Sequence, residues 1–164
     1  MFYLAGDEKE KALEYLAAAA DVAQDATCER ARCGSVIVKD DEVIGKGYNS
    51  PPGNLESQRR CHLPKDAYHQ KVTDKTCCVH AEQRAVMDAL AHNPDRIEGS
   101  TLYFMRIDEE GEMTEAGDPY CTICSKMVLD AGVERFVLRH RDGIGSYLTS
   151  EYNERSFSFG TASD

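Results

Sequence analysis

The sequence predicts a layered α/β domain built around a mixed sheet. Segments with helical and strand patterns follow one another in the order helix, hairpin, helix, strand, helix, strand. The 164 residues suit one domain with one hydrophobic core. Apolar residues make up 41% of the chain and charged residues 29%, and no apolar run is long enough to cross a membrane.

The N-terminal half predicts a helix, a hairpin and a long irregular segment. A helix is expected over 7–26, because Asp7 can cap it and its alanine-rich centre favours helix. Residues 34–39 and 42–48 are expected to form two strands joined by a turn. Residues 49–76 are polar, contain prolines and lack periodicity; a loop of this length in a compact domain is usually functional.

The C-terminal half predicts two further pairs of a helix and a strand. The helices are expected over 80–92 and 121–131, and the strands over 100–107 and 133–139. Aromatic side chains after residue 143 fit a final helix and strand. We therefore expect residues 1–164 to form a single domain with an inserted loop at about 50–78 and a C-terminal extension at about 143–164.

Charge and cysteine content exclude several classes of protein. A formal net charge of −10 disfavours binding to long nucleic acids, which usually requires a basic surface. The N-terminus lacks the basic residues of a secretory signal, and an odd number of cysteines argues against a disulfide framework. We expect a cytoplasmic protein with reduced thiols, some of them bound to metal. The seven cysteines are Cys28, Cys33, Cys61, Cys77, Cys78, Cys121 and Cys124.

Two short motifs predict a catalytic zinc site. His80-Ala81-Glu82 precedes one expected helix, and Cys121-Thr122-Ile123-Cys124 begins another. His80, Cys121 and Cys124 supply three ligands of the kind that zinc prefers, which leaves a fourth position for water. Zinc lowers the pKa of such a water to near neutrality. Glu82 is then available to carry protons between the water and a substrate nitrogen.

The position of these motifs at helix starts suits metal binding. The electropositive start of a helix favours thiolates, and the spacing of the two cysteines puts both on one helix face. His80 and Glu82 would lie about 200° apart on a regular helix. They can flank one ion only if His80 stands at the entry to the helix. The cysteine pair alone could also belong to a structural zinc site or to a redox site.

From about residue 28 to 139, the chain resembles the cytidine/deoxycytidylate deaminase superfamily, and the deoxycytidylate branch in particular. Besides the two zinc motifs, which are typical of nucleobase deaminases, the resemblance includes Arg32-Cys33-Gly34-Ser35-Val36-Ile37-Val38, Gly47-Tyr48-Asn49-Ser50-Pro51-Pro52-Gly53 and Thr101-Leu102-Tyr103. It implies a three-layer α/β/α cytidine deaminase-like fold with a central mixed five-stranded sheet, and a homo-oligomer.

The resemblance also implies roles for individual residues. Glu82 would move protons to the ring nitrogen and to the departing ammonia. Asn49 would hydrogen-bond the sugar or the base, and the backbone N–H of Ala81 would meet the pyrimidine carbonyl. Two positions depart from the family pattern. Tyr120 precedes the first cysteine where the family has proline, so it is expected near the substrate's amino group, and Gln83-Arg84 follows the glutamate where an asparagine is common.

A second, structural zinc near the inserted loop is a further implication of the resemblance. Its ligands would be Cys28, Cys61, His69 and either Cys77 or Cys78, with His62 as an alternative to His69. Zinc binding would order a polar loop that cannot order itself. The alternative is that these cysteines are buried and free, because thiols also behave as small apolar groups.

The function expected from the sequence is zinc-dependent hydrolytic deamination of a cytosine nucleotide, with dCMP converted to dUMP and ammonia released. Arg59-Arg60 and Arg139-His140-Arg141 are basic clusters that could hold a phosphate, although each taken singly is more typical of a solvated surface. Two alternatives stay open. The first is a deaminase of another free base or nucleoside, such as cytidine, guanine or a modified nucleoside; the second is a catalytically silent, zinc-stabilised binding module.

Overall fold

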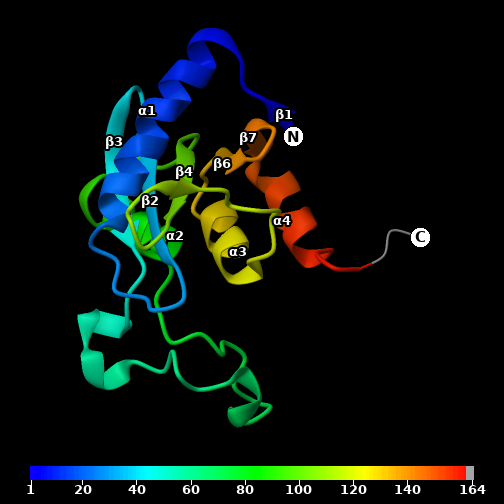
Figure 1. Ribbon diagram of the computed structural model, residues 1–164. Helices are drawn as coiled ribbons and strands as arrows, with labels where there is room; N and C mark the ends of the chain where they lie inside the picture. The colour runs from blue at the N-terminus through cyan, green and yellow to red at the C-terminus, as the bar shows by residue number, and fades with distance from the viewer. Residues whose placement is uncertain (162–164) are drawn as a thin grey trace.

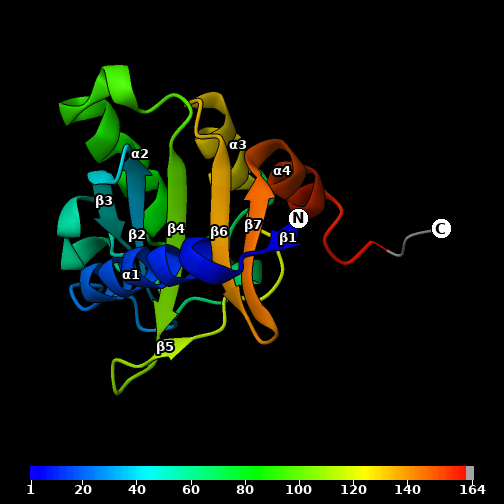
Figure 2. The ribbon, with the colours of Figure 1, turned by 90° about the horizontal axis from the view of Figure 1, so that it is seen from above.

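A mixed seven-stranded sheet lies between two helical layers (Figures 1 and 2). The computed structural model of the protein describes residues 1–161. The strands are β1 (Phe2–Tyr3), β2 (Arg32–Lys39), β3 (Glu42–Tyr48), β4 (Thr101–Ile107), β5 (Met113–Thr114), β6 (Arg135–His140) and β7 (Gly143–Leu148). The helices are α1 (Gly6–Ala23), α2 (Ala81–His92), α3 (Thr122–Asp130) and α4 (Thr149–Phe157).

The strands are ordered β1-β7-β6-β4-β2-β3, and β5 pairs with β4. β4 and β6 run parallel, whereas the other neighbouring strands run antiparallel. The three-layer α/β/α prediction is confirmed, but the sheet has seven strands and not five. The difference comes from β1 and β5, which have only two residues each and extend the sheet formed by the five longer strands.

The C-terminal segment contains a strand followed by a helix, in the reverse of the order stated in the sequence prediction. β7 pairs with β6, and α4 then packs on the same side of the sheet as α2 and α3 (Figure 2). Tyr147 of β7 and Tyr152 of α4 are buried in the core. Residues 143–157 are therefore part of the layered body, and 162–164 lie outside the described residues.

Glycines in the hairpin of β2 and β3 allow a helix to pack closely on each face of the sheet. Its turn is formed by Asp40 and Asp41, which both have positive φ, as tight hairpin turns require. Gly34 of β2 faces α1, whereas Gly47 of β3 faces the first turn of α2. Neither position has space for a side chain, so the start of α2 lies directly on the sheet.

The predicted inserted loop leaves the body after β3 and returns just before α2 (Figure 1). It contains three short 3₁₀ turns, Pro52–Asn54, Glu56–Gln58 and Lys65–Ala67. Its two ends meet where the Val79 N–H donates a hydrogen bond to the Ser50 carbonyl over 2.9 Å. We call residues 50–79 the insertion.

Within residues 1–161, none of the helices has both the length and the apolar character that a membrane crossing needs.

The substitution Gly34→Ala is expected to destabilise the protein by about 1–3 kcal/mol, the usual cost of overpacking. An added Cβ would lie 2.1 Å from the Ala19 carbonyl oxygen and 2.6 Å from the Ala23 nitrogen, so α1 would have to move. Urea unfolding measures the effect. Ala17→Ser, on the exposed face of α1, is the control and should change stability by less than about 0.5 kcal/mol. An unfolding midpoint equal to that of the unmodified protein would contradict this close packing.

Candidate active site

The two predicted zinc motifs meet at one edge of the sheet, because α2 and α3 both begin there. His80 is the N-cap of α2 and has extended backbone angles, and its N–H donates to the Gln83 side-chain oxygen over 2.9 Å. Cys121 is the N-cap of α3. His80 thus stands at the entry to its helix, in the position that its spacing from Glu82 requires.

Three ligand atoms converge between the two helix starts. His80 Nδ1 lies 3.1 Å from Cys124 Sγ and 3.4 Å from Cys121 Sγ, and all three atoms lie within 4.8 Å of one another. A tetrahedral zinc with bonds of about 2.0–2.3 Å holds its ligand atoms about 3.3–3.8 Å apart. The observed distances lie close to this range, so one imidazole nitrogen and two sulfurs are placed where they can share a single zinc ion.

The charges of the three ligands also suit a cation. The hydrogen bond from the Cys124 thiol, together with the nearby His80, lowers the pKa of Cys121 to about 4. The hydrogen bond with Cys121 raises the pKa of His80 to about 9. The hydrogen bond that the Cys124 thiol donates to Cys121, together with burial, raises the pKa of Cys124. A metal ion would displace the protons of His80 and Cys124, because zinc binds neutral imidazole and thiolate.

Glu82 lies in the first turn of α2 and is only 6% exposed. Burial raises its pKa above the ordinary carboxyl value, and the charge of His80 partly opposes this shift. A carboxyl group whose pKa is moved toward neutrality can both accept and donate a proton near pH 7. Glu82 therefore has the properties of a proton carrier beside the three ligands.

A cavity of about 250 Å³ opens beside these residues and is lined by all three residues that the sequence predicts to contact substrate. Ala81 is the first residue of α2, so its backbone N–H has no acceptor within the helix. Tyr120 is 52% exposed, and its ring packs against Phe159 with 5.7 Å between the ring centroids. Asn49 is buried.

Asn49 holds the strand that forms one wall of the cavity. Its side-chain oxygen accepts from the Cys33 N–H over 2.8 Å, and its side-chain nitrogen donates to the Ala31 carbonyl over 2.8 Å. An amide side chain still has one N–H and one lone pair free after these two bonds. Asn49 can therefore position the wall and contact a ligand at the same time.

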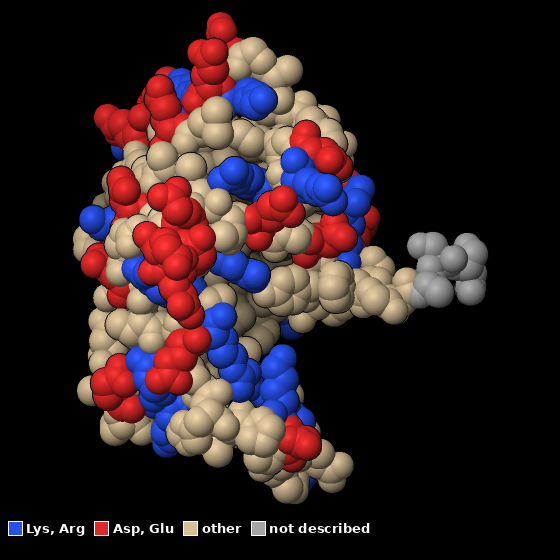
Figure 3. All heavy atoms as spheres, in the orientation of Figure 1, with Lys and Arg blue, Asp and Glu red and all other residues tan. Residues whose placement is uncertain are grey.

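Basic side chains line the cavity, and three of them, Arg60, Lys65 and Lys75, belong to the insertion. In Figure 3, lysine and arginine gather in the hollow between the body and the insertion, although acidic residues are prominent over much of this face. The five cations that line the cavity are Arg30, Arg60, Lys65, Lys75 and Arg106. Of the basic clusters noted in the sequence, only Arg60 is among them. Arg59 instead pairs with Glu56, and Arg139 donates to the Met113 carbonyl.

Sequence reasoning missed the other four cations because each stands singly in an irregular segment or at a strand end. Arg106 lies near the end of β4, opposite Cys33 in the sheet register, and its Nε is buried without a hydrogen-bond partner among the described residues. The sequence did offer one signal for Arg106: the residue lies near the end of an expected strand, and that end lies on the same side of the sheet as the zinc motifs.

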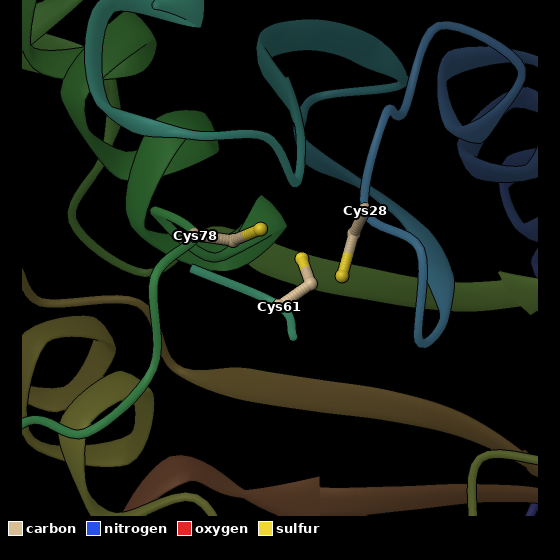
Figure 4. A group of neighbouring side chains, drawn as sticks. All are labelled: Cys28, Cys61 and Cys78. Atoms are coloured by element: carbon tan, nitrogen blue, oxygen red, sulfur yellow. The ribbon is translucent and has the colours of Figure 1, made fainter. Parts of the chain in front are cut away.

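A second group of sulfur atoms lies beside the same cavity (Figure 4). The sulfurs of Cys28, Cys61 and Cys78 lie within 4.8 Å of one another, and Figure 4 shows them pointing toward a common centre. Cys77 Sγ is 3.3 Å from Cys61 Sγ and 3.8 Å from Cys78 Sγ. We call these four residues the sulfur cluster.

His69, a predicted ligand of this second site, lies elsewhere. Its Nδ1 accepts a hydrogen bond from the Lys71 N–H over 3.2 Å, and its side chain is not part of the converging group. His62, the proposed substitute, is also outside the group. Both expectations came from the sequence order of the insertion, which does not reveal how the segment turns.

Arg84, one of the departures from the family pattern, braces the base of the insertion. Its guanidinium donates to the Pro51 carbonyl over 3.0 Å and reaches the Ser50 carbonyl at 3.5 Å. It also lies over the Tyr48 ring at 5.5 Å from the centroid. Arg84 therefore joins α2 to the segment that carries Asn49.

Comparison with known proteins gives consistent relatives. A family profile described as the cytidine and deoxycytidylate deaminase zinc-binding region matches residues 9–140. The chain is similar to the deoxycytidylate deaminase of Mycobacterium phage D29, with 31% identity over 129 residues, which cover 75% of this chain and 89% of the relative.

Two solved structures share the fold. The dCMP deaminase of cyanophage S-TIM5, solved in complex with dCMP and dUMP, superposes with a TM-score of 0.56 and 24% identity, over 80% of this chain and 82% of the other. The cytidine deaminase of Burkholderia pseudomallei superposes with a TM-score of 0.55 and 15% identity, over 85% and 94% of the two chains.

Proposed function

Because the chain belongs to the cytidine and deoxycytidylate deaminase family, we propose that it catalyses the hydrolytic deamination of dCMP to dUMP and ammonia. The observation that carries the proposal is the buried Glu82 beside three converging zinc ligands, in a cavity that five cations also line. The zinc site would provide the nucleophile, Glu82 the proton transfers, and the cations the binding of a phosphate.

Zinc is the cofactor, and His80, Cys121 and Cys124 are proposed to hold it. One imidazole nitrogen and two thiols within 4.8 Å of one another support this assignment. When bound, zinc lowers the pKa of a water to near neutrality and so makes a hydroxide nucleophile available at pH 7. The start of α3 supports the two thiolates by its positive end.

Glu82 is proposed to carry two protons in turn. It accepts the first from the attacking water and delivers it to the ring nitrogen next to the carbon that bears the amino group. It then carries the proton of the newly formed hydroxyl to the amino group, which leaves as ammonia while a carbonyl forms. Its raised pKa suits both directions of transfer.

Asn49, Ala81 and Tyr120 are proposed to position the base. The free N–H of Ala81 suits a pyrimidine carbonyl, and the remaining donor and acceptor of Asn49 suit the sugar or the base edge. Tyr120 immediately precedes the ligand Cys121 and lines the cavity, which supports a place near the leaving amino group.

The basic residues that line the cavity favour binding of a nucleotide over a free nucleoside. Arg30, Arg60 and Lys75 bring positive charge to a cavity in a chain of formal net charge −10. Charge-assisted hydrogen bonds from such groups are the usual means of binding phosphate. A catalytically silent binding module has no need of a buried carboxyl next to a three-ligand zinc site, so the structure favours an enzyme.

We also propose a second zinc ion at the sulfur cluster. Cys28, Cys61 and Cys78 converge as ligands would, and Cys77 supplies a fourth sulfur close by. The Cys78 thiol lowers the pKa of Cys28 to about 5 by hydrogen bonding to it, so one thiolate is available for the metal. Four sulfurs are a donor set typical of structural zinc.

Three further proposals concern the chain as a whole. Residues 1–164 would act as a single domain. Self-association would cover apolar side chains of α2 and α3, since Met87 is 48%, Leu90 46% and Leu129 38% exposed. A reducing compartment such as the cytoplasm would suit the seven cysteines, which form no disulfide within residues 1–161.

An ammonia-release screen across dCMP, CMP, dCTP, deoxycytidine, cytidine and guanine tests the proposed activity. We expect kcat/KM for dCMP to exceed that for deoxycytidine about 10- to 100-fold, because hydrogen bonds to a charged group contribute about 1.5–3 kcal/mol. Faster release from guanine or from a free nucleoside would contradict the assignment to a nucleotide. A zinc-loaded protein that releases no ammonia from any of the six would favour the binding module.

A further inference from the structure

We propose that the sulfur cluster sets the preference for a nucleotide, because its metal-bound form assembles the cations that bind the phosphate. This inference rests on the proposed deaminase function and deepens it. In this arrangement the cysteines are positioning residues that act through Arg30, Arg60 and Lys75. Occupancy of the cluster by metal would then change the binding of phosphate more than it changes the chemistry at Glu82.

The cluster joins three separate segments of the chain. Cys28 lies in the loop before β2, Cys61 lies within the insertion, and Cys78 lies at the end of the insertion (Figure 4). Each segment carries a cation of the cavity close to its cysteine. Arg30 is two residues after Cys28, Arg60 directly precedes Cys61, and Lys75 is three residues before Cys78. Fixing the sulfurs therefore fixes the backbone from which the cations extend.

The other interactions between these segments are hydrogen bonds of Arg30 and Arg59 and an ion pair between Arg59 Nε and Glu29 at 3.6 Å. Arg30 donates to the Cys61 carbonyl over 3.1 and 2.7 Å and to the Leu63 carbonyl over 3.1 Å, and Arg59 donates to the Thr27 carbonyl over 2.7 Å. Most other residues of the insertion are exposed, so it has little apolar core of its own. Partly exposed hydrogen bonds alone give little rigidity, whereas a metal bound by several sulfurs links all three segments.

Rigidity matters because phosphate binding requires several long side chains at once. Ordering each rotamer-rich cation on binding opposes association, and a preorganised site avoids most of that cost. Arg30 links the sulfur cluster to the cavity directly. Its guanidinium donates two hydrogen bonds to the Cys61 carbonyl, and the residue also lines the cavity. Displacement of Cys61 would therefore move or free Arg30.

The catalytic ligands depend less on the sulfur cluster. His80, Cys121 and Cys124 are held by the starts of α2 and α3, which pack on the sheet. Cys78 is only two residues from His80, so a change there would affect both sites. Cys28 and Cys61 lie on segments remote in sequence from His80 and from each other, and they offer the cleaner test.

The experiment compares Cys28→Ser, Cys61→Ser and the double variant with the unmodified protein. Zinc per chain is measured by mass spectrometry, dUMP and deoxyuridine binding by calorimetry, and kcat/KM for dCMP and deoxycytidine by ammonia release. We expect each variant to lose one of two zinc ions. The ratio of kcat/KM for dCMP to that for deoxycytidine should fall at least about tenfold, mainly through KM, and dUMP affinity should fall by a similar factor.

The double variant should resemble each single variant, because breaking either ligand already empties the site. Thr73→Ala, at an exposed position of the insertion, is the control and should keep both zinc ions and the same ratio. Retention of two zinc ions by Cys28→Ser, or equal losses for dCMP and deoxycytidine, would overturn the proposal.

Failure of the proposed function would look different. In that case no cytosine substrate would release ammonia. The affinities for dUMP and deoxyuridine could still be measured by calorimetry in the unmodified protein and in the cysteine variants. Tighter binding of dUMP that disappears in the variants would support the inference without the activity. Equal affinity of the unmodified protein for dUMP and deoxyuridine would contradict the inference itself.

Discussion

The substitution Glu82→Gln is expected to lower kcat by about 10²–10⁴-fold or more, the usual contribution of a positioned general acid–base group. The glutamine side chain has the same shape but can neither accept a proton from water nor deliver one to the substrate. Glu82 is buried, so bulk water has little access to replace it. Ammonia release under saturating dCMP measures the loss.

Zinc content separates this chemical effect from a structural one. Glu82 is not among the three converging ligands, so the variant should keep the same zinc per chain as the unmodified protein. Glu10→Gln changes an exposed carboxylate on α1 and should leave kcat unchanged. Retained ammonia release by Glu82→Gln, with zinc bound, would rule out the proton-carrying role.

The substitution Cys124→Ser is expected to remove the catalytic zinc and with it at least about 10³-fold of activity. Metal ions contribute several kcal/mol to such reactions, and each 1.36 kcal/mol corresponds to a factor of ten. Cys124 is fully buried and its sulfur lies 3.1 Å from His80 Nδ1. Without it, His80 and Cys121 are left with an incomplete ligand set, so we also expect a lower melting temperature.

Metal analysis and calorimetric melting of Cys124→Ser check this prediction. Zinc per chain should fall by one relative to the unmodified protein. Cys33→Ser provides a matched control for metal content, because Cys33 is buried in β2 but belongs to neither group of converging sulfurs. Full zinc content in Cys124→Ser would mean that the ion is held by other residues.

The sequence anticipates that His80, Cys121 and Cys124 meet, because the relevant geometry is local. The two-residue spacing of His80 and Glu82 requires His80 to stand before the helix, and α2 does begin at Ala81. The spacing of Cys121 and Cys124 similarly requires one helical turn. The proposed roles of these residues stay predictions. The residues themselves lie together because α2 and α3 begin side by side at the same edge of the sheet.

Long-range contacts explain what the sequence did not predict. β7 reads Gly-Ile-Gly-Ser-Tyr-Leu, which has weak strand propensity, and its pairing with β6 determines its conformation. In the insertion, Lys65 and Lys75 lack periodic neighbours, so the sequence pattern does not place them beside the cavity that they line. Long-range contacts also explain the wrong prediction for His69. Its place in the sequence suggested that it lies with the thiols, but the fold puts it outside their group.

The neck of the insertion has a consequence for how this scaffold can change. Ser50 and Val79 are hydrogen-bonded to each other, so the polypeptide departs and re-enters at a single point beside α2. The entropy of closing such a loop grows only slowly with its length. We therefore expect that a segment of another length between Ser50 and Val79 would leave the sheet and the start of α2 in place, while it changes the side chains that line this end of the cavity.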